Sequence, residues 1–152
     1  MRRNEKSQSQ EWCQERLKKA PYGVLSLVDS KKRPYGIPLN FVYDQEKIYI
    51  HAARSGEKVD SIGQGAKACF TVISKGEIVP EKFSTNYESV VCFGTIRPLE
   101  EKQKKVQALK MLIEKYSKDF LQEGFAYVER DVEGTQVFGL EIEEKTGKKN
   151  QE

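Results

Sequence analysis

The sequence predicts a mainly β fold, an antiparallel barrel with helices at its periphery. Several short runs of β-branched and aromatic residues are separated by polar turns, which is typical of antiparallel strands. Strands and helices do not alternate in the order that builds a parallel sheet, so a Rossmann-type topology is disfavoured. One long helical pattern stands in the C-terminal half. Closing such a sheet into a barrel removes its exposed edges.

Length and composition indicate one domain over residues 1–152. Of the 152 residues 38% are hydrophobic, enough for a single compact core. The net charge is only +3 and lies in mixed-sign runs, so nucleic acid is not an expected partner. A mean hydropathy of -0.68 and no apolar run of about 18 residues argue against a membrane partner. The polar N-terminus lacks the features of a signal peptide, so a cytoplasmic location is expected.

The N-terminal third is expected to form one helix and three strands. Trp12, Cys13 and Leu17 give a loose helical spacing between about Gln8 and Lys19, and the proline at position 21 ends this helix. The strands are predicted at residues 22–28, 35–43 and 47–51, and the first two form a hairpin across a polar turn.

The remainder of the chain is expected to add two helices and three strands. A short helix at 57–62 ends at glycines, and apolar residues spaced three and four apart between 100 and 120 give the best helical pattern in the chain. The strands are predicted at 68–74, at 87–96 with a break at Gly94, and at 136–143. The terminal segments 1–7 and 145–152 are expected to be frayed.

Pro38 lies inside a strand-like run, where it costs a ladder donor and therefore indicates an edge, a bulge or the mouth of a barrel. Free backbone amides at such a mouth could bond the polar edge of a flat heterocycle, with Leu39 and Phe41 as apolar contacts. Ordinary core packing explains these two side chains equally well, and both interpretations stay open.

The segment 51–58 joins a strand end to a short helix and contains two cations, a hydroxyl and a glycine. A helix N-terminus, a flexible Gly56 and the charges of Arg54 and Lys58 together suit a phosphate group. The structural alternative is a solvated loop with a capping serine.

His51 is the single histidine of the chain and the candidate catalytic residue. Its functional interpretation is a hydrogen-bond or proton-transfer partner to a ligand, and its structural one is a ring bonded to a backbone carbonyl. One histidine and three cysteines without CxxC spacing do not predict a metal site, and Cys13, Cys69 and Cys92 are expected to be free, buried thiols.

Four sequence blocks, taken in order, are similar to those of a known family. They are residues 20–26, residues 34–43, residues 48–53 followed by Gly56 and Lys58, and residues 79–94. Together they resemble the nitroimidazole-resistance branch of the pyridoxamine-phosphate oxidase-like FMN-binding split barrels, from about Glu11 to Gly139.

This resemblance implies a six-stranded split β-barrel that forms a homodimer with FMN between the subunits. It implies phosphate contacts from Arg54, Ser55 and Lys58. It places Leu39, Asn40 and Phe41 along the isoalloxazine, with His51, Ala52 and Ala53 lining the same groove. It also offers Tyr87 and Ser89 as residues that reach the partner's flavin.

The implied activity is an FMN-dependent reductase or oxidase acting on a small, electron-poor acceptor such as a nitroaromatic molecule. No GxGxxG motif is present, so an NAD(P)H donor would bind only transiently over the flavin. The alternative is a non-enzymatic protein that binds flavin or haem, with His51 as the axial ligand. The colour of the purified protein distinguishes flavin from haem.

Overall fold

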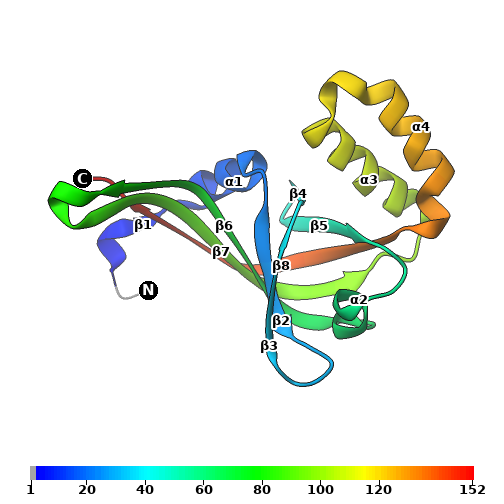
Figure 1. The fold of residues 1–152 in the computed structure, drawn as a ribbon, viewed down its shortest axis with the longest axis horizontal. Helices are drawn as coiled ribbons and strands as arrows, with labels where there is room; N and C mark the ends of the chain where they lie inside the picture. Colours follow the sequence, from blue (N-terminus) through cyan, green and yellow to red (C-terminus); the bar gives the residue numbers. More distant parts are fainter. Residues whose placement is uncertain (1–2) are drawn as a thin grey trace.

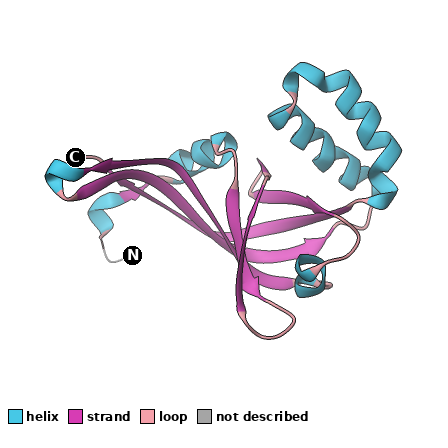
Figure 2. Ribbon diagram, viewed as in Figure 1, coloured by secondary structure: helices cyan, strands magenta, loops and turns pink. Residues whose placement is uncertain are grey.

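The computed structural model describes residues 3–152 as one antiparallel sheet of eight strands with four α-helices (Figures 1 and 2). The strands are β1 (Ser7–Gln8), β2 (Gly23–Val28), β3 (Pro34–Leu39), β4 (Val42–Asp44), β5 (Lys47–Ala52), β6 (Ala66–Val79), β7 (Ser84–Pro98) and β8 (Gln136–Asn150). The helices are α1 (Gln10–Lys19), α2 (Glu57–Ile62), α3 (Lys102–Tyr116) and α4 (Leu121–Asp131). Short 3-10 helices are η1 (Asn4–Lys6), η2 (Pro80–Lys82), η3 (Lys118–Phe120) and η4 (Val132–Gly134).

The sheet is open, which corrects the prediction of a closed barrel. Its strands follow the order β3-β2-β6-β7-β8-β5-β4, with β1 paired to β8, so β3 and β4 are its edges. Six strands were expected, and eight are present. The expected strand 35–43 is divided at Asn40–Phe41 into β3 and β4, and the two-residue β1 adds the other.

The division at Asn40–Phe41 has a visible cause. The backbone N–H of Phe41 donates to the Tyr116 hydroxyl and its carbonyl accepts from Lys115, so neither group is available for a strand ladder. Of the three positions that Pro38 indicated, the edge is the one observed, because β3 pairs only with β2 in the described part of the chain.

The C-terminal segment is ordered, against the prediction that 145–152 frays. Residues 145–150 continue β8 and pair with β7, for example Lys145 with Cys92 and Asn150 with Tyr87. Polar contacts stabilise this end: the Lys145 ammonium lies 2.6 Å from both carboxylate oxygens of Glu46, and the Asn150 amide donates to the Thr85 carbonyl at 2.7 Å. At the other end residues 4–8 form η1 and β1, and residues 1–2 lie outside the described chain.

Strands β6, β7 and β8 extend beyond the rest of the sheet as a long ribbon (Figure 1). Gly94 marks a register shift where the predicted break was placed, yet β7 continues through it. A Cβ atom at Gly94 would lie 1.9 Å from the carbonyl oxygen of Glu141, so only glycine lets the two strands approach here.

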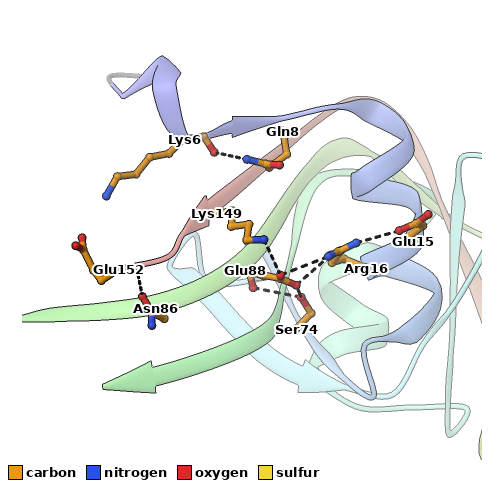
Figure 3. Close-up of polar contacts among 9 residues, drawn as sticks. All are labelled: Lys6, Gln8, Glu15, Arg16, Ser74, Asn86, Glu88, Lys149 and Glu152. Atoms are coloured by element: carbon orange, nitrogen blue, oxygen red, sulfur yellow. Dashed lines mark hydrogen bonds and ion pairs between the residues drawn. The ribbon is translucent and has the colours of Figure 1, made fainter. Parts of the chain in front are cut away.

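Helix α1 forms as predicted and is attached to the ribbon by charged groups. The Ser9 side chain caps it by accepting from the Trp12 N–H, and Leu17 is buried. Arg16 donates to Glu88 on β7 at 3.0 Å, and Ser74 beside the bulge of β6 donates to the same carboxylate (Figure 3). The Arg16 hydrogen bond lowers the pKa of Glu88 below its usual range.

The predicted helix 100–120 is α3, which ends at Tyr116, and a second helix, α4, follows where none was predicted. The two form a hairpin beside the sheet (Figure 1). Its apolar cluster joins both helices to the sheet through Val42, Ala108, Leu109, Leu112, Val128, Val132 and Val137. The main core lies under α1 and contains Phe41 and Phe70, whose rings pack edge to face at 4.8 Å.

Cys13 and Cys92 are buried and Cys69 is half-buried, and all three are free thiols. Between residues 3 and 152 no three His, Cys, Asp or Glu side chains gather as metal ligands. None of the helices described is long and apolar enough to cross a membrane.

Candidate functional site

A hollow of about 380 Å³ lies where β3 ends, between the start of β2 and the β5–α2 connection. It is lined by Tyr22, Pro38, Leu39, Asn40, His51 and Lys58. Four of these six residues were predicted to belong to the site. They are Leu39, Asn40, His51 and Lys58, and they lie up to nineteen positions apart in the sequence. The fold therefore brings part of the predicted phosphate segment to the predicted strand mouth.

Strand alternation decides which residues of β5 face the hollow. Successive side chains point to opposite faces, so His51 is exposed while Ile50 and Ala52 are buried. Ala52, which was expected to line the groove, is buried in the main core and is not among the residues that line the hollow. Ala53 is exposed just beyond the strand end.

His51 and Lys58 supply the titratable groups of the hollow. The Lys58 ammonium lies 3.5 Å from the backbone carbonyl of His51, at the limit of a hydrogen bond. Partial desolvation, with a smaller effect of the Lys58 charge, lowers the pKa of His51 below 6.5. Its imidazole is therefore neutral at pH 7, with one nitrogen that donates and one that accepts. Desolvation also lowers the pKa of Lys58.

Arg54 does not face the hollow. Its guanidinium donates to the backbone carbonyl of Glu133 in η4. Ser55 is exposed, and the residue that caps α2 is Gly56, with no side-chain cap bond, so the capping-serine alternative is not what forms. Gly56 has φ of 136°, a conformation that favours glycine, and open space surrounds the position of a Cβ atom there.

Phe41 is placed differently from the expectation. Its side chain is fully buried against Phe70 and has no surface to offer a flavin. The apolar wall of the hollow comes instead from Leu39 and from Tyr22, which is 64% exposed. Sequence reasoning missed Tyr22, although it lies in the first of the four similar blocks.

Tyr87 and Ser89 lie on β7 in the ribbon and do not line the hollow. Alternation puts both on the face that carries Val91 and Phe93, and Phe93 is 47% exposed.

A larger groove of about 710 Å³ runs between α3 and strands β5, β7 and β8. Its lining includes Lys47, Tyr49, Arg97, Met111, Glu114 and Glu141. It contains none of the predicted residues, and charges of both signs line it without an evident preference for a ligand. The smaller hollow is the better candidate site, because residues of the predicted phosphate segment and of the predicted strand mouth both line it.

The sequence matches the model of a known protein family over most of its length. The family model described as pyridoxamine 5'-phosphate oxidase matches residues 9–149. The chain belongs to this family. A comparison with curated proteins gives no match.

Solved structures share the fold of this pyridoxamine 5'-phosphate oxidase family member at low sequence identity. A candidate 5-nitroimidazole antibiotic resistance protein from Bacteroides thetaiotaomicron is 24% identical, with 93% of this chain and 84% of that chain covered and a TM-score of 0.79. An FAD and haem binding protein from Mycobacterium smegmatis is 20% identical, with 97% and 74% covered and a TM-score of 0.83. A flavocytochrome from Azotobacter vinelandii is 19% identical, with 100% and 72% covered and a TM-score of 0.80.

Proposed function

We propose that this chain is a homodimeric flavoprotein that binds FMN in the hollow beside β3. The observation that carries the proposal is the meeting of Lys58 and His51 with the edge of β3 and the apolar wall of Leu39 and Tyr22. The family match and the flavin-binding proteins among the structural neighbours support it.

The residues present fit the two chemical parts of FMN. Its phosphate needs cationic donors, which Lys58 supplies at the hollow and Gly56 leaves accessible. Its flat heterocycle needs apolar contact and polar edge partners, for which Leu39, Tyr22 and the backbone of an edge strand are suited. Of the other proposed phosphate contacts, Ser55 is free to take part, whereas Arg54 must first leave Glu133.

An apolar sheet face next to the hollow supports the dimer. In register, Pro38 opposes Val24, Val24 opposes Thr71, and Thr71 opposes Val91, so these residues cross β3, β2, β6 and β7 in one row. Val24 and Ile73 on this face are 39% and 65% exposed. Because Pro38 also lines the hollow, a second copy on this face would cover the bound ligand.

The same face carries Tyr87 and Ser89, and Ser89 directly opposes Ile73. A two-fold dimer through this face brings each ribbon to the partner subunit. This arrangement is how Tyr87 and Ser89 would reach the partner's flavin.

When bound, FMN supplies electron transfer to a small electron-poor acceptor, such as a nitroaromatic compound. In this proposal Lys58 holds the phosphate, Leu39 and Tyr22 exclude water from the heterocycle, and the neutral imidazole of His51 hydrogen-bonds the ligand or passes a proton. An NAD(P)H donor binds transiently over the same site. A cytoplasmic location belongs to the proposal and is tested by cell fractionation.

The experiment is an absorbance and fluorescence spectrum of the purified protein, followed by titration of the ligand-free chain with FMN, FAD and haemin. Saturable binding of FMN, tighter than that of FAD, supports the proposal. An FMN-loaded sample is then screened for NAD(P)H-dependent reduction of nitroaromatic compounds. Failure to bind any flavin would overturn the proposed function.

A second candidate is a non-enzymatic flavin or haem carrier. The observation in its favour is the exposed His51, which is neutral at pH 7 and therefore in the form that ligates haem iron. Two neighbouring structures are also named for both flavin and haem or as a flavocytochrome. A Soret band after haemin addition that His51→Ala abolishes would favour this candidate over the reductase.

A further inference from the structure

The last residues of α3 contact both chain segments that frame the hollow. The Tyr116 hydroxyl accepts the backbone N–H of Phe41 at 3.0 Å and lies 2.6 Å from the carbonyl oxygen of Pro21. Pro21 immediately precedes Tyr22, and Phe41 immediately follows Asn40. One phenol oxygen thus joins the link between α1 and β2 to the break between β3 and β4.

The carbonyl oxygens of Pro21 and Phe41 each have a hydrogen-bond donor. The single hydroxyl proton of Tyr116 has two acceptors in reach, the Pro21 oxygen at 2.6 Å and the Phe41 oxygen at 2.9 Å, and the shorter contact is the natural choice. The Phe41 oxygen still accepts from the Lys115 ammonium at 2.9 Å. The Asn40 side-chain amide also donates to the Pro21 oxygen at 3.3 Å.

The contact has a second component in the Phe41 ring. The Lys115 ammonium lies 3.8 Å from the centroid of this ring, which is fixed in the core against Phe70. The end of α3 is thereby attached to a rigid part of the core. Tyr22, Leu39 and Asn40 are held on either side of that attachment.

We propose that Tyr116 and Lys115 are positioning residues for the ligand in the hollow, acting through Pro21 and Phe41 on the wall formed by Tyr22, Leu39 and Asn40. This inference rests on the proposed function, since the ligand is FMN. The end of α3 would then support the binding site from outside, since neither positioning residue lines the hollow.

The test is Tyr116→Phe, which removes one oxygen and keeps the ring. Losing the acceptor leaves the Phe41 N–H without its partner, so we expect FMN to bind about tenfold more weakly, equivalent to roughly 1.4 kcal/mol. Tyr127→Phe is the matched control, because Tyr127 is an exposed tyrosine of the same hairpin whose hydroxyl makes no hydrogen bond in the described structure. The control should bind FMN as the unaltered chain does.

A second readout needs no flavin. Hydrogen exchange of the Phe41 amide in the ligand-free protein should speed up in Tyr116→Phe and stay unchanged in Tyr127→Phe.

A third readout uses the bound flavin. Lys115→Met should change the visible circular dichroism of bound FMN, which reports the surroundings of the heterocycle, at temperatures where the fold is intact.

The outcomes separate the two claims. If the unaltered chain binds FMN and Tyr116→Phe binds it equally well, the positioning role is wrong and the flavin proposal stands. If the unaltered chain binds no flavin, both are overturned. Weaker binding in Tyr116→Phe alone, with faster Phe41 exchange, supports the inference.

Discussion

Lys58 is the residue on which the binding proposal depends most. It is the one formally charged side chain among those lining the hollow, and the protein around it has already removed part of its water. A phosphate that replaces this water gains a charge-assisted hydrogen bond in a partly desolvated place. Arg54, two residues past the strand end, is engaged with Glu133 and contributes only if that bond is exchanged.

Replacing Lys58 with alanine should weaken FMN binding by roughly 1–3 kcal/mol, because a charge-assisted hydrogen bond is lost. Arg54→Ala should weaken it less. Fluorescence titration measures both, and Lys31→Ala, an exposed lysine in the β2–β3 turn, is the control. Equal affinity in Lys58→Ala and the control would remove Lys58 from the site.

Lys115 gives the protein a pH dependence of stability. Desolvation lowers its pKa from 10.5 to about 8 in the folded chain. Between pH 8 and pH 10.5 the unfolded chain keeps the Lys115 proton, whereas the folded chain releases it. Lys115 therefore raises the free energy of unfolding as pH rises from about 8 to 10.5. The penalty of holding a desolvated charge is present below pH 8 and relieved above it.

Urea unfolding at pH 7 and pH 10 tests this effect. The unaltered chain should gain stability relative to Lys115→Met between the two pH values. Lys118→Met, which removes an exposed lysine three positions away, should follow the unaltered chain. Parallel behaviour of Lys115→Met and the unaltered chain would contradict the assignment.

At the level of elements, local patterns predicted those structures whose cause is local. Pro38 correctly indicated an edge strand, because a missing donor is a property of the residue itself. The spacing of apolar residues also predicted α1 and the start of α3. The strand break at Phe41 was not, because Tyr116 and Lys115, about 75 positions away, cause it.

Two further elements were missed for different reasons. The signal for α4 was present, since Phe125, Val128 and Val132 recur at helical spacing, but the predicted helix was ended at Phe120, one residue before α4 begins, and no second helix was predicted. The end of β8 has the polar sequence of a frayed tail. It is ordered because Lys145 and Asn150 are buried against partners that are distant in the sequence, which the local pattern does not indicate. Of the predicted phosphate segment, Lys58 and His51 line the proposed site, but the sequence did not indicate that Arg54 donates to Glu133 instead.

Gly94 should tolerate no side chain. In Gly94→Ala the new methyl group would meet the Glu141 carbonyl, and the strands must separate, which should cost roughly 1–3 kcal/mol or more of unfolding free energy. Gly134→Ala is the matched control, since nothing lies within 4 Å of a Cβ atom there. Denaturant unfolding of the two variants compares them directly, and equal stability would argue against the close approach.

At the level of the whole molecule, the proposed dimer would cover the hollow. Pro38 lines the hollow and also begins the row that continues through Val24, Thr71 and Val91. Assembly and ligand binding are therefore coupled in the proposed dimer, since each copy would stabilise the other's site.

A charge in this row should separate the copies. Val24→Asp is expected to shift sedimentation from dimer to monomer and to weaken FMN binding at the same time, because an unpaired carboxylate cannot be buried at low cost. Tyr127→Asp, on exposed α4, should remain dimeric. A monomeric unaltered chain at micromolar concentration would refute the dimer, and loss of the dimer with full FMN affinity would refute the coupling.

The position of β8 also determines when the protein can fold during its synthesis. This strand follows all the other strands in the chain, yet it lies inside the sheet between β7 and β5 and pairs with β1 as well. Until residues 136–150 leave the ribosome, β5 and β7 each present an unpaired edge, and β4 and β5 form only an isolated hairpin. Until β8 has been made, the nascent chain exposes these unpaired strand edges, which favour aggregation with other chains.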